Sequence, residues 1–426
     1  MLCINTPIGK SWMPMGEGKA MYRTTFRDMP DDALSINENA LGAIQELDVR
    51  NEHILFLSTN LEWGGSEELW SRTALKLAME GLDVIALVHT SLLAQKRVLE
   101  LQESGACVLS YPLPVTLWRR ARRKLSGKTW SVLDLEELLP SVRPALVVIS
   151  DGSALPPIDI AEMFVTKKWP FVSIGQSNCE RWWPSDELAA RYRKILPAAL
   201  RCYFVSNANQ RVAETHLGCK IENAEVVRNP FNVAYDAAPP WPSIDVNSEL
   251  RLACVARLEP AAKGQDILLE ALAHPSWAGR RWRLTLYGDG PSRIGLARLV
   301  ERLQLNDRVV FAGHVSIVEE IWASNHVLTM PSRWEGLPLA IVEAMLCARP
   351  VMATDVGGNS EVIENGVSGI LAAAPTIVSV REALEVLWTR REDLREMGKA
   401  AAKTIRQQVP RDPIDVFARK IKCLRR

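Results

Sequence analysis

Short, continuously apolar runs separated by helix-like stretches limit most strongly what this chain can fold into. The runs at 53–58 (HILFLS) and 145–150 (ALVVIS) are apolar at nearly every position, so they lack the alternation of a strand with one solvated face. Between such runs, apolar residues recur at helical spacing, as at 63–81. This alternation is typical of βαβ units, in which helices cover both faces of a parallel sheet. The sequence therefore predicts an α/β fold.

The alternation is interrupted at residues 236–248, where DAAPPWPSIDVNS is rich in Pro, Ser and Asp and reads as a linker. A chain of 426 residues also exceeds the ~100–200 residues of an ordinary domain. We therefore predict two Rossmann-like parallel-sheet domains facing each other across a cleft, at 51–238 and 248–405. Residues 1–50 carry no sustained period and are predicted to be a poorly ordered or peripheral extension.

Composition excludes several classes of protein. The 51 basic and 50 acidic residues give a net charge of +1, so no global basic field indicates a nucleic-acid partner. No apolar run approaches the ~20 residues that span a bilayer, and the N-terminus does not resemble a secretory signal. The eight cysteines are scattered without a C-x-x-C pair, which argues against a disulfide framework or a zinc ribbon. We expect a cytoplasmic protein.

Motifs for metals and common cofactors are missing. None of the six histidines forms H-E-x-x-H, no Asp-x-Asp pair is present, and the Walker loop is absent. Gly288-Asp289-Gly290 starts like a dinucleotide fingerprint, but Arg293 stands where the third glycine belongs, which favours a simple strand-to-helix turn. We therefore expect neither a metal nor a resident cofactor.

Two glutamates stand out in the segment 331–371. Glu335 follows the apolar run HVLTM, and Pro338 suits the first position of the helix that comes next. Glu343 puts a carboxylate on that otherwise apolar helix, and an unpaired buried carboxylate costs several kcal/mol. Either two ligand hydroxyls or an arginine elsewhere in the fold would satisfy it. In the stretch 337–339, the free amides of Leu337 and Leu339 favour negative charge or polar acceptors.

A pair of cations follows an apolar run in the second half. Arg257 comes directly after RLACVA, and Lys263 lies six residues later, before a helix. Two cations at the carboxyl end of a strand can neutralise a diphosphate, Arg through its fork and Lys as a point charge. The alternative is that both are solvated loop cations.

Six motifs in this order resemble those of family-4 glycosyltransferases, which have the two-domain GT-B fold. The resemblance covers roughly residues 52–405 and is strongest in the second half. It implies that residues 406–426 form a C-terminal helix that packs back on the N-terminal domain. The motifs are WGGSE at 63–67, VARLEPAAKGQD at 255–266, YGDGP at 287–291, RVVFAGHV at 308–315, EGLPLAIVEAM at 335–345 and TDVGGNSEVI at 354–363.

The resemblance implies roles for residues of the second half. Arg257 and Lys263 would bind the donor diphosphate, and Glu343 would accept hydrogen bonds from the ribose hydroxyls. Glu335 would hold the transferred sugar. The backbone of the next three residues would assist it: Gly336, Leu337 and Pro338.

Further roles are implied for two glycine-containing segments. Gly313, His314 and Val315 would lie near the base of the nucleotide. Gly64 and Gly65 would let the first helix approach the phosphates.

The chain departs from the family after the apolar run FVSI. The family commonly has a histidine there, whereas this chain reads GQSN at 175–178. Gln176 or Asn178 could supply a neutral hydrogen bond in its place. Alternatively, the segment is a subfamily loop without a catalytic role.

Two surface segments bear on the acceptor. The stretch 117–130 carries six basic residues and no acid, with apolar residues at helical spacing, which suits contact with an anionic membrane. The alternative is a solvated basic face. Trp182 and Trp183 could form a wall for a sugar acceptor, although a buried core corner would explain at least one of them.

The resemblance as a whole implies a hexosyltransferase-type glycosyltransferase of polysaccharide or glycolipid biosynthesis. It would move a sugar from a UDP- or GDP-sugar to a hydroxyl of a glycan or lipid-linked acceptor, without a metal and with retention. It would work in the cytoplasm or peripherally on the inner face of the membrane. The alternatives are another sugar-nucleotide enzyme on the same fold, such as an epimerase, and a non-catalytic sugar-nucleotide binding protein.

Overall fold

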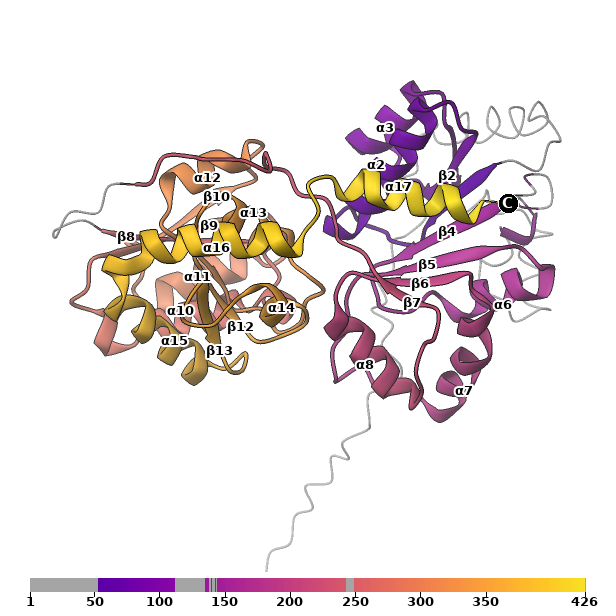
Figure 1. Cartoon of the computed structure of the whole chain (residues 1–426). Coiled ribbons are helices and arrows are strands. Elements are labelled where there is room, and N and C mark those ends of the chain that lie inside the picture. The colour runs from indigo at the N-terminus through magenta and orange to yellow at the C-terminus, as the bar shows by residue number, and fades with distance from the viewer. Residues whose placement is uncertain are drawn as a thin grey trace, which may run out of the picture.

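The computed structural model describes residues 53–111, 144–242 and 249–425, together with 135–137, 139 and 142. The extension at 1–50 and the basic stretch at 117–130 lie outside the described residues. Figure 1 shows two lobes side by side, the indigo-to-magenta lobe formed by the first half of the chain and the orange lobe by the second.

The first domain contains a seven-stranded parallel sheet in the order β3-β2-β1-β4-β5-β6-β7. Its strands are β1 (Ile54–Ser58), β2 (Val84–His89), β3 (Cys107–Tyr111), β4 (Leu146–Asp151), β5 (Phe171–Gly175), β6 (Arg201–Phe204) and β7 (Ala224–Val226). Its main helices are α2 (Gly65–Met79), α3 (Lys96–Glu103), α6 (Ile158–Lys167), α7 (Asp186–Ile195) and α8 (Asn207–Leu217).

The second domain contains a six-stranded parallel sheet in the order β10-β9-β8-β11-β12-β13. Its strands are β8 (Leu250–Val255), β9 (Trp282–Tyr287), β10 (Val309–Gly313), β11 (Val327–Met330), β12 (Val351–Thr354) and β13 (Gly369–Ala372). Its helices are α9 (Pro260–Lys263), α10 (Gln265–Leu272), α11 (Arg293–Arg302), α12 (Val318–Ser324), α13 (Leu339–Leu346), α14 (Asn359–Val362), α15 (Ile377–Thr389) and α16 (Leu394–Gln408). The predicted fold class, two parallel-sheet α/β domains, is confirmed.

The continuous apolar runs are explained by burial on both faces of each sheet. In β1, Leu55 and Leu57 point into the core under α6, α7 and α8, whereas Ile54 and Phe56 point into the core under α2, α3 and α17. Successive side chains of a strand alternate between faces, so a sheet covered on both sides needs an apolar residue at every position. The second sheet is covered in the same way by two sets of helices.

The last helix, α17 (Pro413–Leu424), leaves the second domain and packs on α2 of the first, as the yellow ribbon in Figure 1 shows. Phe417 is fully buried there. Its ring lies edge-on to the ring of Tyr203, with the two ring centroids 5.1 Å apart. The boundary expected at residue 405 falls inside α16, because the helix continues to Gln408 and stops only before Pro410.

The two domains meet where the carboxyl ends of their strands lie. The carboxylate of Glu361 accepts a hydrogen bond from the backbone amide of Ala208 at 2.6 Å and lies 3.4 Å from the guanidinium of Arg228. Both charged side chains are largely shielded from solvent, so this contact fixes part of the domain interface. Among the described helices, none is both long enough and apolar enough to cross a bilayer.

Candidate functional site

Lys263 and Glu335 form the central polar contact between neighbouring loops of the second domain. Glu335 follows β11 and is only 5% exposed. Its Oε1 accepts hydrogen bonds from Lys263 Nζ at 2.8 Å and from Ser332 Oγ at 2.7 Å. Within the described part of the chain, no group donates to its other oxygen, Oε2. The nearly buried carboxylate is thus charge-compensated and keeps one oxygen for a ligand.

Arg257 reaches across the cleft to the other domain. Its Nη1 lies 2.5 Å from a carboxylate oxygen of Glu62, in the loop between β1 and α2, and its Nε lies 3.6 Å from Glu259. The side chains of Arg257 and Glu62 are 43% and 64% exposed, so solvent screens their attraction. Each of the two cations singled out in the sequence therefore has a carboxylate partner, and that of Arg257 comes from the opposite domain.

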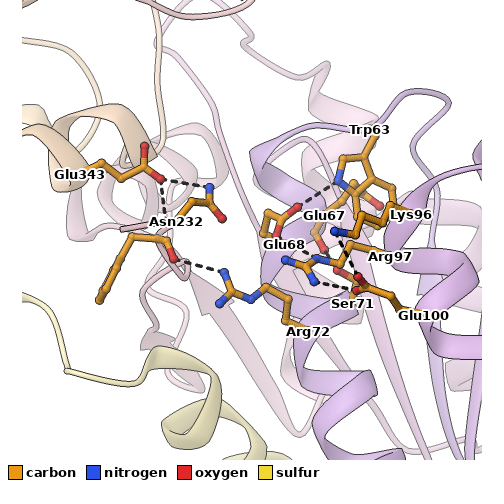
Figure 2. Close-up of polar contacts among 11 residues, drawn as sticks. Trp63, Glu67, Glu68, Ser71, Arg72, Lys96, Arg97, Glu100, Asn232 and Glu343 are labelled. Atoms are coloured by element: carbon orange, nitrogen blue, oxygen red, sulfur yellow. Dashed lines mark hydrogen bonds and ion pairs between the residues drawn. The ribbon is translucent and has the colours of Figure 1, made fainter. Parts of the chain in front are cut away.

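Glu343 is buried on α13 and contacts the segment that leads out of the first domain. Its Oε1 accepts hydrogen bonds from the backbone amide of Asn232 at 2.9 Å and from Asn232 Nδ2 at 3.1 Å (Figure 2). Burial raises the pKa of Glu343 to about 6, and the two bonds from Asn232 oppose that rise.

Among the described residues, no arginine donates a hydrogen bond to this carboxylate. In Figure 2, Arg72 of α2 points toward the same segment but donates to the carbonyl oxygen of Phe231, at 3.3 Å. None of the described groups donates to Glu343 Oε2. The sequence missed this arrangement, since Asn232 lies 111 residues earlier and carries no motif of its own.

The N-terminal ends of α2 and α13 approach each other at the cleft. A Cβ atom on Gly65 would lie 3.3 Å from Leu339 Cδ1. Gly64 caps α2 without a side-chain hydrogen bond, so the first amides of that helix have no side-chain partner from the cap. Pro338 caps α13 with an extended ψ of 131°, so the helix begins one residue later than expected, at Leu339.

Gly336 lies at a close contact between the two domains. A Cβ atom there would lie 1.9 Å from the carbonyl oxygen of Gln176, so no larger residue fits. Its carbonyl oxygen accepts a hydrogen bond from the amide of Gly358 at 2.6 Å. Leu337, the next residue, is buried. The backbone after Glu335 is therefore held between loops of both domains.

Gln176 and Asn178, in the segment GQSN at 175–178, bond to other residues of the first domain. Gln176 donates to the carbonyl of Ser66 at 3.1 Å and accepts from Asn229 at 2.8 Å. Asn178 exchanges two hydrogen bonds with Asn209, at 2.7 and 2.9 Å. The backbone of Asn178 also pairs with that of Glu335. The side-chain amides thus fix the loop after β5 within the first domain, and the backbone pairing holds the loop against the second domain.

The predicted base-binding turn follows β10. Gly313 has a φ of 73°, which glycine adopts without strain, and its carbonyl accepts from the amide of Gly288 at 2.7 Å. His314 is exposed and Val315 is half-buried. Across the described residues, no hydrogen bond joins this turn to Lys263 or Glu335.

Glu67 is a buried carboxylate to which the sequence analysis assigned no role. It is completely buried and accepts hydrogen bonds from Ser58 Oγ and Trp70 Nε1, each at 2.7 Å, and from Asn60. Asn60 in turn accepts from the amide of Gly152 at 3.0 Å, so the loops after β1 and β4 are tied together. Burial raises the pKa of Glu67, while these hydrogen bonds lower it. The sequence could have pointed to this residue, because Glu67 is the last residue of the motif WGGSE at 63–67.

A cavity of about 530 Å³ is lined by residues of both domains, among them Trp334, the residue before Glu335. Trp182 and Trp334 face each other in its wall, with ring centroids 5.5 Å apart. Trp182 and Trp183 are 44% and 62% exposed, so the alternative of a buried core corner is wrong for both. The lining residues are Cys179, Arg181, Trp182, Pro260, Ala261, Asp266, Arg333 and Trp334.

Residues 249–390, which span the second sheet, match one family model. Its description is Glycosyl transferases group 1. Alpha-D-kanosaminyltransferase of Streptomyces kanamyceticus is 33% identical over 144 residues, which are 33% of this chain and 37% of that protein. N-acetyl-alpha-D-glucosaminyl L-malate synthase of Bacillus anthracis is 34% identical over 126 residues, 30% of this chain and 33% of that protein. The chain thus spans about a third of the length of these curated relatives.

Solved structures resemble the chain over most of its length. Anabaena HepE in complex with UDP-glucose has a TM-score of 0.65 at 19% identity, covering 87% of this chain and 99% of that one. Sucrose-phosphate synthase from Thermosynechococcus elongatus has a TM-score of 0.65 at 16% identity, covering 87% of this chain and 98% of that one. The fold is GT-B. In this GT-B fold, Arg257 follows β8, Lys263 ends the short helix α9 and Glu335 follows β11, at the edge facing the first domain. Among the described residues, no cluster of three or more His, Cys, Asp or Glu side chains could hold a metal ion.

Proposed function

We propose that this protein is a hexosyltransferase-type glycosyltransferase. It moves a sugar from a nucleoside-diphosphate sugar to a hydroxyl of a glycan or lipid-linked acceptor. The observation that carries the proposal is the contact between Lys263 and Glu335, a cation and a nearly buried carboxylate at the cleft of a GT-B fold. The family match of residues 249–390 and the names of the relatives support it.

The donor diphosphate binds to Arg257 and Lys263. Arg257 can exchange its exposed contact with Glu62 for phosphate oxygens, because that ion pair is screened by solvent. Lys263 has three donor hydrogens, of which Glu335 takes one, so it can bind a phosphate oxygen at the same time. The N-terminal end of α2 at Gly64 and Gly65 adds backbone amides on the opposite side.

The remaining parts of the donor fit the two glutamates and the turn after β10. Glu335 Oε2 accepts a hydroxyl of the transferred sugar, aided by the backbone of residues 336–338, and Glu343 Oε2 accepts the ribose hydroxyls. The turn formed by residues 313–315 contacts the base.

Transfer proceeds with retention by attack on the same face of the sugar. The bond between the anomeric carbon and the β-phosphate oxygen breaks, and the acceptor oxygen forms its bond from that same side. The acceptor proton passes to the departing phosphate oxygen, so the products are a glycoside and a nucleoside diphosphate. Arg257 and Lys263 stabilise the negative charge that develops on the leaving group. The anomeric coupling constant of the product, measured by NMR, tests retention, and an inverted product refutes it.

The two cations also support transfer without a metal ion. A divalent cation in such a reaction neutralises the leaving diphosphate, and two positive side chains at the same position supply equivalent charge.

Calorimetric titration with UDP, GDP and ADP in buffer containing EDTA tests the proposal first. We expect one nucleotide to bind without metal and Lys263→Ala to lose that binding, and we then expect the matching sugar nucleotide to be consumed. If none of the three binds with EDTA or with added Mg²⁺, the proposed function is wrong. Binding only with Mg²⁺ refutes metal independence alone.

We also propose that the protein works in the cytoplasm and contacts the anionic inner face of the membrane through residues 117–130. The six basic residues of that stretch support electrostatic attachment. Co-sedimentation with phosphatidylcholine vesicles, with and without phosphatidylglycerol, tests it. We expect binding only to the anionic vesicles and its loss when Arg122, Arg123 and Lys124 become Gln. Equal binding to both kinds of vesicle contradicts the proposal.

A further inference from the structure

The cavity is lined by residues from the same two segments that carry the proposed reaction residues. Trp334 immediately precedes Glu335, and Pro260 and Ala261 lie between Arg257 and Lys263. The opposite wall comes from the loop after β5. A molecule in this cavity therefore contacts both domains and touches the two segments that carry Lys263 and Glu335.

The walls of the cavity combine two aromatic rings from different domains. The rings of Trp182 and Trp334 lie 5.5 Å apart at an interplanar angle of 62°. Trp182 lines the cavity and remains 44% exposed, so part of its apolar surface has no protein partner. Exposed aromatic surface at a concave site marks a ligand-binding position.

Fixed polar groups line the same space. The guanidinium of Arg333 makes two hydrogen bonds to the carboxylate of Asp266, each 2.7 Å long, and a third to the carbonyl of Pro260 at 2.6 Å. This geometry holds both charged groups in place for a ligand with hydroxyls. A lipid tail in the cavity would strip water from these charges without replacing its hydrogen bonds, which is costly.

We propose that this cavity binds a pyranose ring of the acceptor glycan. One face of the ring lies on Trp182, and its hydroxyls bond to the Asp266–Arg333 pair. The volume of about 530 Å³ lies within the ~300–1,000 Å³ typical of ligand sites. This inference rests on the proposed function, because it assigns the acceptor to a position beside the donor sugar.

Trp183 provides a matched control from the same loop. It is 62% exposed, and its ring lies against His216 at a centroid distance of 5.1 Å. It does not line the cavity. Trp183→Ala thus removes the same side chain as Trp182→Ala, one position away, and leaves the proposed site intact.

Saturation-transfer NMR of the full chain with methyl α-D-glucopyranoside, methyl α-D-mannopyranoside and octyl β-D-glucopyranoside tests the inference directly. We expect transfer to the ring protons of at least one methyl glycoside with the wild type and with Trp183→Ala. Trp182→Ala should reduce it by about fivefold or more, the loss expected for a removed aromatic contact of about 1 kcal/mol. Thermal denaturation confirms that each variant is folded, and Trp334→Ala provides a second variant on the opposite wall.

Three outcomes overturn the inference: wild-type transfer in Trp182→Ala and Trp334→Ala, no transfer to any methyl glycoside in the wild type, or transfer confined to the octyl chain. Nucleotide titration separates this failure from that of the proposed function. If sugars bind at Trp182 but no nucleotide binds, the transferase proposal fails and the cavity assignment stands. If a nucleotide binds unchanged in all variants but no sugar binds, only the cavity assignment fails.

Discussion

Replacing Glu62 with Gln should strengthen the binding of the donor diphosphate. Glu62 belongs to the first domain, and its carboxylate holds the guanidinium of Arg257 at 2.5 Å. A diphosphate that uses Arg257 must displace this carboxylate. Glutamine keeps the size of the side chain but removes the charge, so it competes less for the guanidinium.

The size of the effect follows from the exposure of the pair. The two side chains are 43% and 64% exposed, and exposed ion pairs of this kind contribute about 0.2–1 kcal/mol. At 1.4 kcal/mol for each tenfold change, the dissociation constant should fall by roughly 1.4-fold to 5-fold. At about 0.5 M salt the gain should disappear, because the attraction is screened.

Calorimetric titration with the preferred nucleoside diphosphate, at low and high salt, measures the effect. Glu259→Gln is the matched control, since that carboxylate lies 3.6 Å from the same guanidinium and should change the affinity less. In the double variant with Arg257→Gln, the gain from Glu62→Gln should vanish. Weaker binding by Glu62→Gln alone would show that Glu62 assists the ligand, and our reasoning would be wrong.

Three further substitutions test the site. Glu335→Gln should abolish sugar transfer while leaving the circular dichroism spectrum unchanged, and wild-type turnover would remove Glu335 from the mechanism. Burial raises the pKa of Glu343 from 4.5 to about 6, so its contribution to stability is fully present below pH 4.5 and is lost as the pH rises through about 6. Glu343→Gln keeps a carbonyl acceptor and should flatten this slope, unfolding at higher temperature than the wild type at about pH 7.5; identical melting profiles would refute the pKa assignment. The same variant should bind the nucleotide more weakly. Gly336→Ala puts a Cβ atom 1.9 Å from the carbonyl oxygen of Gln176 and should lower the free energy of unfolding by about 1–3 kcal/mol. The control is Gly295→Ala in α11, where the added Cβ atom meets open space and should raise the free energy of unfolding by about 0.5–1 kcal/mol. Denaturant unfolding measures both changes. Equal effects of the two alanines would contradict the close domain contact.

The fold was predictable because burial leaves a direct trace in the sequence. Leu55 and Phe56 face opposite cores, and that requirement makes every position of β1 apolar. The proximity of Lys263 and Glu335 was also accessible, since both residues follow apolar runs whose carboxyl ends meet at one edge of a sheet. The positions of Lys263 and Glu335 relative to the predicted strands were therefore enough to predict this part of the site.

Contacts between residues of the two different domains left no such pattern in the sequence. The bonds of Asn232 to Glu343 and the pairing of Glu62 with Arg257 depend on how two separately folded sheets face each other. The contact between Trp182 and Trp334 depends on the same placement. None of these residues has a periodic or spaced partner in the chain, so one sequence alone offers no means of pairing them.

The return of α17 to the first domain has a consequence for the order in which the protein is made. The core that lies against α2 includes Phe417 and Ile421, which are synthesised after the whole second domain. Until they emerge, the apolar side of that domain around Tyr203 stays uncovered while the entire second domain is synthesised. The first domain therefore completes this core only after the second domain has been synthesised, although it comes earlier in the sequence.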